Sequence, residues 1–178
     1  MNKPQANPEH AKTLTEVLDY WADIKPNSEL LRFYPSGEGD YQHLSYQQFR
    51  QRCLSIAEQL RPFKGERALL FYYSGVEFLE ALYACFYAGV IAAPAYPPKR
   101  NHKINRLQNV IENCQPAVVL STAQVAGQCQ QTVEDALPNL KANWLNTETI
   151  ATNQAAKHET AVSGEDIAFL QYTSGSTG

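Results

Sequence analysis

The chain has 178 residues, of which 44% are hydrophobic and 19% are charged, and its formal net charge is −3. This length is enough to bury the core of one domain, and the composition excludes an intrinsically disordered protein. The slightly acidic balance excludes the strongly basic face that is typical of nucleic-acid-binding proteins. We therefore expect one globular domain that does not bind nucleic acid.

The N-terminal residues 1–12 are polar and contain two prolines, and we expect them to be disordered. They lack the apolar region of a secretory signal. The longest apolar stretch, Phe78 to Ala95, is interrupted by Glu80, Gly89 and Pro94. Such a stretch predicts a helix followed by a strand rather than a membrane span, so we expect a soluble protein.

The cysteines show neither CxxC spacing nor histidines at metal-ligand spacing, and each lies in a stretch that predicts helix. They are Cys53, Cys85, Cys114 and Cys129. We interpret them as buried, reduced, structural thiols and expect no metal site. Reduced thiols favour a cytoplasmic location.

The first helix is predicted to begin at Thr13, where Thr13 and Glu16 form a capping box. Two strand-like runs, Glu29–Tyr34 and Tyr41–Leu44, flank a stretch with two glycines and predict a hairpin. Ser45 and Gln48 form a second capping box, which opens a helix that ends near Arg61.

The next elements alternate between strand and helix. Arg67–Tyr73 is a continuous apolar strand of the kind that is buried on both faces of a parallel sheet. A helix opened by Ser74–Glu77 runs to Ala88, with Gly89 as its stop signal. Val90–Tyr96 is the following strand.

The same alternation continues through a helix at 103–114, a strand at 117–121, a helix to Leu137 and a strand near Trp144. The polar segment 148–165 follows neither period and is predicted to be an exposed loop. Repeated strand–helix–strand units predict an α/β fold with a mostly parallel sheet flanked by helices.

The last predicted strand, Ile167–Thr173, runs directly into residues rich in glycine and hydroxyls. These candidate site residues are Thr173, Ser174, Gly175, Ser176, Thr177 and Gly178. Glycines allow successive backbone amides to converge on one anion, and hydroxyls can hold phosphate oxygens. The sequence is not a Walker A motif, which requires a lysine. Composition alone is equally typical of a flexible turn, and the placement after an apolar strand is what favours a phosphate site.

Three motifs in order resemble the adenylate-forming enzymes, which include acyl-CoA synthetases, luciferases and peptide-synthetase adenylation domains. Tyr172–Gly178 (YTSGSTG) is similar to the start of that superfamily's phosphate-binding motif. Leu82–Pro94 (LYACFYAGVIAAP) resembles its helix–Ala-Gly–strand–Pro element, and Leu44–Phe49 (LSYQQF) resembles its early helix start. Together these motifs cover nearly the whole chain.

Two further stretches resemble the fatty acyl-AMP ligases within that superfamily. They are Ala95–Pro98 (AYPP), which is followed by basic residues, and Phe169–Tyr172 (FLQY), which leads into the loop. The resemblance implies the N-terminal subdomain of the adenylate-forming fold, incomplete and cut within the phosphate-loop motif.

The resemblance also implies a function. The complete enzyme would use ATP and Mg²⁺ to convert a fatty acid into acyl-AMP, and residues 173–178 would hold the β- and γ-phosphates. The acyl group would then pass to the pantetheine of an acyl carrier protein or of a polyketide or peptide synthase. The resemblance places the catalytic residues after Gly178, so we expect the isolated chain to be inactive and assign it no catalytic residue.

Alternatives remain open at this point. The chain could instead belong to an acyl-CoA synthetase or an amino-acid adenylation domain, or it could be a non-catalytic α/β binding domain. The basic run Lys99–Arg106 could meet a carrier protein or its pantetheine arm, or it could be a solvated loop. Trp21 and Trp144 are expected to be packing groups.

Overall fold

The structure, a computed structural model, describes residues 8–98, 105–158 and 161–173. Its main sheet has four parallel strands in the order β4-β3-β5-β6. These strands are Arg67–Phe71 (β3), Ile91–Ala95 (β4), Val118–Ser121 (β5) and Asn143–Asn146 (β6). The prediction of an α/β fold with a mostly parallel sheet is confirmed.

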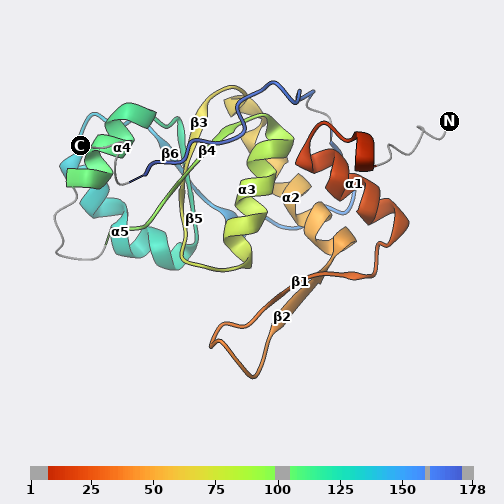
Figure 1. Ribbon diagram of the computed structural model, residues 1–178. Coiled ribbons are helices and arrows are strands. Elements are labelled where there is room, and N and C mark those ends of the chain that lie inside the picture. Colours follow the sequence, from red (N-terminus) through yellow and green to blue (C-terminus); the bar gives the residue numbers. More distant parts are fainter. Residues whose placement is uncertain (1–7, 99–104, 159–160, 174–178) are drawn as a thin grey trace.

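Helices cover both faces of this sheet (Figure 1). On one face lie Leu14–Ile24 (α1), Tyr46–Leu60 (α2) and Val76–Ala88 (α3), and on the other lie Asn105–Cys114 (α4) and Ala123–Ala136 (α5). Short 3₁₀ turns occur at Pro8–His10 (η1), Arg61–Phe63 (η2) and Thr147–Thr149 (η3). This layering explains why the central strands are apolar throughout.

The central strand β3 packs on both faces of the sheet. Ala68 and Leu70 join the core under α1, α2 and α3, whereas Leu69 and Phe71 join the core under α4 and α5. All four side chains are at most 1% exposed. Because successive side chains of a strand point to opposite faces, a strand covered on both faces needs an unbroken apolar run.

The observed N-terminal caps of α1, α2 and α3 match the predicted capping hydrogen bonds to different extents. The box at Ser45 is complete, with Gln48 N donating to Ser45 Oγ (3.2 Å) and Ser45 N donating to Gln48 Oε1 (2.9 Å). Thr13 Oγ1 accepts from Glu16 N, but the Glu16 carboxylate accepts from the amide of Lys12 rather than that of Thr13. Gly75 caps α3 without a side-chain hydrogen bond, since it has no side chain.

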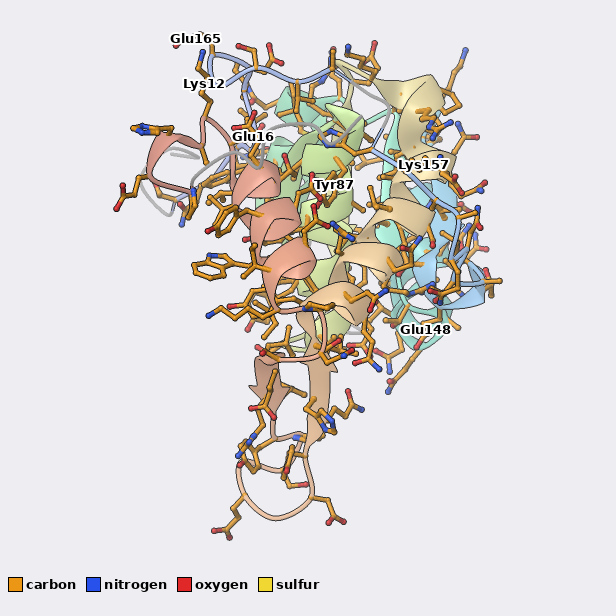
Figure 2. All side chains as sticks on the ribbon, turned by 90° about the vertical axis from the view of Figure 1, so that its right-hand side faces the viewer. Lys12, Glu16, Tyr87, Glu148, Lys157 and Glu165 are labelled. Atoms are coloured by element: carbon orange, nitrogen blue, oxygen red, sulfur yellow. The ribbon has the colours of Figure 1, made fainter. Side chains whose placement is uncertain are left out.

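The predicted hairpin forms from Glu29–Phe33 (β1) and Gln42–Ser45 (β2), and it extends away from the helices (Figures 1 and 2). Tyr34 and Tyr41 pack with ring centroids 5.3 Å apart, and the Arg32 guanidinium lies over the Tyr41 ring at 4.5 Å.

Within the described residues, no helix is long and apolar enough to cross a membrane.

Residues 147–158, which we call the strap, run from the end of β6 across α2. Most of this segment was predicted to be an exposed loop, and most of its side chains are exposed, but Thr147 (1% exposed) and Ala156 (5%) are buried. Asn153 N donates to Ser55 Oγ at 2.8 Å, and the Gln51 side chain donates to the carbonyls of Asn153 and Ala156. The strap is therefore attached to α2 despite its irregular backbone.

The end of α3 depends on the backbone of Gly89. Gly89 has a left-handed φ of +65°, and a Cβ built there would lie 3.2 Å from Val162 Cγ1. A side chain is strained in this conformation, whereas the exposed Gly127 inside α5 has nothing within 4 Å of an added Cβ.

We expect Gly89→Ala to lower the free energy of unfolding by about 1–2 kcal/mol, because alanine resists the left-handed region. Gly127→Ala should instead raise it by about 0.5–1 kcal/mol, since alanine is the better helix former. Chemical denaturation of both variants measures this. Equal effects of the two substitutions would contradict the assigned role of Gly89.

Candidate nucleotide-phosphate site

The carboxyl ends of all four parallel strands meet at one edge of the sheet. The strands end at Phe71, Ala95, Ser121 and Asn146. In open α/β sheets ligands bind outside this edge, where the chain leaves the strands. The side chains and the later segment that reach this edge are therefore the candidates for a ligand site.

The segment 167–173 lies on the free side of β4 and runs parallel to it. Phe169 forms a parallel bridge with Ala92, Ala92 N donates to Ala168 O at 3.0 Å, and Leu170 N donates to Ala92 O at 2.7 Å. Because the pairing is parallel, the segment leads toward the carboxyl edge of the sheet. Thr173, which is exposed, is thereby directed to that edge.

Of the six predicted site residues, Thr173 is described, and Ser174, Gly175, Ser176, Thr177 and Gly178 lie outside the described residues. The predicted strand Ile167–Thr173 is reduced to a single bridge. One reason is its position at the edge, where Ile167 is 62% and Phe169 is 49% exposed. The other is Pro94, which cannot donate to a continued ladder.

Tyr172 turns toward the α4 side of the sheet. Its ring packs against the core under α4 and α5, and its hydroxyl donates to Asn113 Oδ1 at 2.8 Å. Burial raises the pKa of the Tyr172 phenol, so the hydroxyl keeps its proton and remains a donor. Sequence patterns did not reveal this contact, because Asn113 occupies an exposed position of a helix far along the chain.

Aromatic side chains also stand at the carboxyl edge. Tyr96, just after β4, is 76% exposed, and Tyr73, just after β3, is 45% exposed. The Tyr73 hydroxyl donates to Gln128 Oε1 of α5 at 3.3 Å. The edge therefore offers exposed aromatic surface just after the ends of the neighbouring strands β3 and β4.

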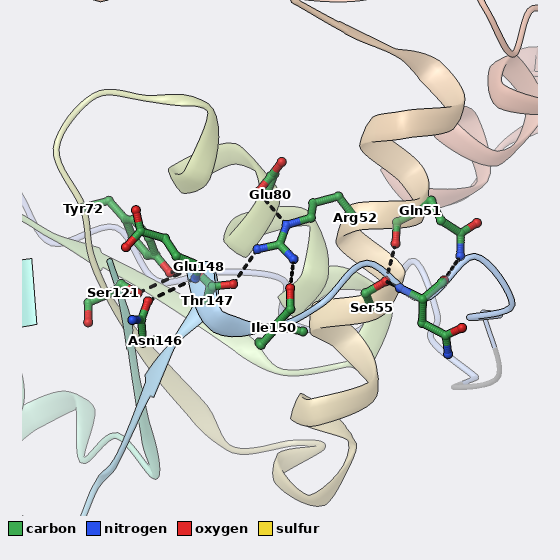
Figure 3. A network of polar contacts seen from close by, with 11 residues as sticks. Gln51, Arg52, Ser55, Tyr72, Glu80, Ser121, Asn146, Thr147, Glu148 and Ile150 are labelled. Carbon is green, nitrogen blue, oxygen red and sulfur yellow. Dashed lines mark hydrogen bonds and ion pairs between the residues drawn. The ribbon is translucent and has the colours of Figure 1, made fainter. Parts of the chain in front are cut away.

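A network of hydrogen bonds holds the residues that follow β6, next to the carboxyl edge of the sheet (Figure 3). The Tyr72 and Thr147 hydroxyls are 3.0 Å apart, and Thr147 Oγ1 donates to the carbonyl of Ser121 at 3.5 Å. The Glu148 carboxylate accepts from Ala123 N at 2.7 Å, at the first residue of α5. A carboxylate at this position satisfies a free helix-start amide and complements the helix dipole.

Arg52 is the centre of this network. Its guanidinium donates to the carbonyls of Thr147 and Ile150 and to Glu80 Oε2, the last at 3.2 Å. Burial raises the pKa of Glu80, and the Arg52 charge opposes that rise. One feature of the sequence indicated the Arg52–Glu80 ion pair, because a glutamate in an apolar helix requires a partner when it is buried.

We expect Arg52→Ala to lower the free energy of unfolding by about 3–5 kcal/mol, because it leaves Glu80 buried without its counter-ion. It also leaves two strap carbonyls without their donor. Urea denaturation measures the loss. Arg32→Ala is the matched control, since its ion pair with Glu29 is largely exposed (44% and 38%), and it should leave stability nearly unchanged. Similar losses in both variants would refute the role of Arg52.

The cysteines are free and buried, which confirms the interpretation of structural thiols. Burial raises the pKa of Cys114 and Cys129 to about 11, and it raises the pKa of Cys53 and Cys85 as well. Thiols with raised pKa are poor nucleophiles and poor metal ligands. Among the described residues, no three His, Cys, Asp or Glu side chains gather to hold a metal ion.

A parallel α/β domain of this architecture is shared with solved adenylate-forming enzymes. The chain belongs to the AMP-binding enzyme family, which matches residues 18–178. It is similar to the fatty acid AMP ligase from Legionella pneumophila, with a TM-score of 0.81, 29% identity, and coverage of 98% of this chain and 30% of that one. The L. pneumophila fatty acyl-adenylate ligase in complex with acyl adenylate and pyrophosphate has a TM-score of 0.79 and 30% identity, covering 95% of this chain and 29% of that one.

Among curated proteins, the chain is 31% identical over 184 residues to the medium-chain fatty acid–acyl-carrier-protein ligase JamA of Moorena producens. That match covers 99% of this chain and 30% of JamA. It is 26% identical to the long-chain fatty acid–AMP ligase FadD32 of Mycolicibacterium smegmatis, covering 90% of this chain and 26% of that protein. The chain thus spans about 30% of the length of these relatives and corresponds to their N-terminal part.

Proposed function

We propose that this chain is the N-terminal part of an ATP-dependent fatty acyl-AMP ligase. The observation that supports the proposal is the parallel pairing of segment 167–173 with β4, which directs Thr173 to the carboxyl edge of the sheet. Relatives named as fatty acid–AMP ligases support the choice of substrate.

In the proposed reaction the fatty acid carboxylate attacks the α-phosphorus of ATP. A carboxylate oxygen–phosphorus bond forms, the bond to the β-phosphate oxygen breaks, and pyrophosphate leaves with the electron pair. In this reaction the role of the chain would be to hold the β- and γ-phosphates through the hydroxyls and backbone amides of residues 173–178. Such donors, fixed before the reaction, stabilise the charge that develops on the leaving group.

Mg²⁺ would offset the negative charge of the phosphates, and we assign it no ligand in this chain. We likewise assign no nucleophile or general base to this chain. We propose that the acyl group passes from acyl-AMP to the pantetheine of an acyl carrier protein or of a polyketide or peptide synthase. The name of JamA, a fatty acid–acyl-carrier-protein ligase, supports a carrier protein as the acceptor. The buried free thiols support a cytoplasmic location.

The product distinguishes the proposed function from its nearest alternative. The protein from the complete reading frame is incubated with dodecanoate, ATP, Mg²⁺ and CoA, and the products are identified by mass spectrometry. We expect acyl-AMP that persists in the presence of CoA, and no product from residues 1–178 alone. Acyl-CoA would favour a CoA ligase instead. The name of one relative, fadD25 of Mycobacterium tuberculosis, describes it as a candidate fatty acid–CoA ligase.

Removing one loop hydroxyl tests the phosphate site. We expect Thr177→Ala to slow ATP–pyrophosphate exchange by about 10²-fold, the usual effect of deleting one preorganised donor. Thr149→Ala is the control, because Thr149 Oγ1 donates to Asn146 O just after β6, which lies at the opposite end of the sheet from β4. Its exchange rate should match that of the unsubstituted protein. An unchanged rate in Thr177→Ala would argue against a phosphate role for that hydroxyl.

A further inference from the structure

The two sides of the domain differ in the side chains that they expose to solvent. On the outer surface of α4 and α5, exposed polar side chains form hydrogen bonds one helical turn apart. These pairs are Gln108–Glu112 (2.9 Å), Gln130–Glu134 (2.8 Å) and Gln131–Asp135 (2.7 Å). Among the side chains that the structure describes, the exposed large hydrophobic residues include none from these two helices. Polar pairs at this spacing are typical of a helix surface that contacts water.

Helix α1 lies on the opposite side of the molecule and exposes apolar side chains (Figure 1). Its buried residues form one stripe, which consists of Thr15, Leu18 and Ala22. A second, apolar stripe runs beside it and consists of residues three or four positions apart, namely Leu14, Val17, Trp21 and Ile24. The two ends of this second stripe, Leu14 and Ile24, are 57% and 46% exposed. The apolar part of α1 is therefore wider than the part that the core covers.

An apolar pocket adjoins the N-terminal end of the exposed stripe. It has a volume of about 200 Å³, and its lining includes Leu14 of α1, Phe86 of α3 and Ile167. Ile167 is itself 62% exposed. At protein interfaces, pockets next to exposed apolar residues accept an aromatic or aliphatic side chain of the partner.

We propose that the exposed stripe of α1 and the adjoining pocket, which we call the α1 face, form the surface on which the rest of the complete enzyme packs. The relatives indicate this partner, because the chain spans about 30% of their length and corresponds to their N-terminal part. The polypeptide that follows residue 178 in a protein of that length is large enough to cover the α1 face. The outer surface of α4 and α5 stays in contact with solvent. This inference rests on the proposed function, since it treats the chain as part of a longer acyl-AMP ligase.

The composition of the α1 face requires an apolar partner surface. Its stripe is aliphatic and aromatic, and burial of such side chains removes apolar area from water, which favours association. Charged residues of α1 lie outside the stripe and have partners within the domain. Asp19 accepts from the Tyr87 hydroxyl at 2.7 Å, and Asp23 pairs with Arg50 at 2.6 Å. Contact with the stripe therefore leaves these polar contacts intact.

Cysteine labelling of the protein from the complete reading frame tests the inference. Leu14→Cys and Ile24→Cys place a thiol on the α1 face, and Gln131→Cys is the matched control on the exposed surface of α5. The rate of modification by a water-soluble maleimide is measured at each position by peptide mass spectrometry and divided by the rate in urea. We expect positions 14 and 24 to react at least about 10-fold more slowly than position 131, because a thiol must be accessible to react.

The outcomes of the labelling are separable. Equal normalised rates at positions 14, 24 and 131 would overturn the inference. Protection at positions 14 and 24 that disappears when the protein is diluted to a monomer would overturn it as well, because the partner would then be a second copy of the chain. Protection that persists in the monomer would support packing within one polypeptide.

A charged substitution gives a second measurement that needs no thiol. Lysine is a good helix former, so it is harmless on a helix surface that contacts water. We expect Ile24→Lys to lower the melting temperature of the complete protein by about 5 °C or more, whereas Gln131→Lys leaves it unchanged. An unchanged melting temperature in Ile24→Lys would contradict burial of the α1 face.

Neither measurement depends on turnover, so failure of the inference and failure of the proposed function are distinguishable. Formation of acyl-AMP by a complete protein whose α1 positions are unprotected would reject this inference alone. Protected α1 positions in a complete protein that forms no acyl-AMP with any fatty acid would reject the proposed function alone.

Discussion

The pairing of β3 with β4 on one side and β5 on the other is the interaction on which the rest of the structure depends. Both pairings are parallel, so all strand ends of the main sheet meet at one edge. Burial of β3 on both faces forces the chain to place helices on either side. These two consequences together give an edge that is free for a ligand and a framework rigid enough to hold the segments that reach it.

The chain must also return from β6, at one end of the sheet, to the free side of β4 at the other. The strap makes the first part of this return across α2, and side chains rather than regular secondary structure hold it there. Arg52, Gln51 and Ser55 all bind strap backbone groups. The ion pair of Arg52 with Glu80 further joins α2 to α3, so the strap is attached to a helix pair that is itself part of the core.

The elements of the fold could be predicted from the sequence because each depends on local chemistry. The box at Ser45 and the apolar run of β3 identify a helix start and a buried strand without knowledge of the remainder. The hydrogen bond between Tyr172 and Asn113 was not predictable, because the two residues are 59 positions apart in the sequence. The single bridge at Phe169, in place of a full strand, likewise depends on which residues of β4 face outward, and periodicity does not specify this.

Pro94 also matters while the chain is still being synthesised. Until residues 167–173 have been made, β4 is an open edge of the sheet, and open edges can recruit strands from other molecules. An edge position without an N–H interrupts the continuous row of donors that such recruitment requires. The proline that limits pairing with the chain's own later segment therefore also protects the nascent domain against intermolecular β-aggregation.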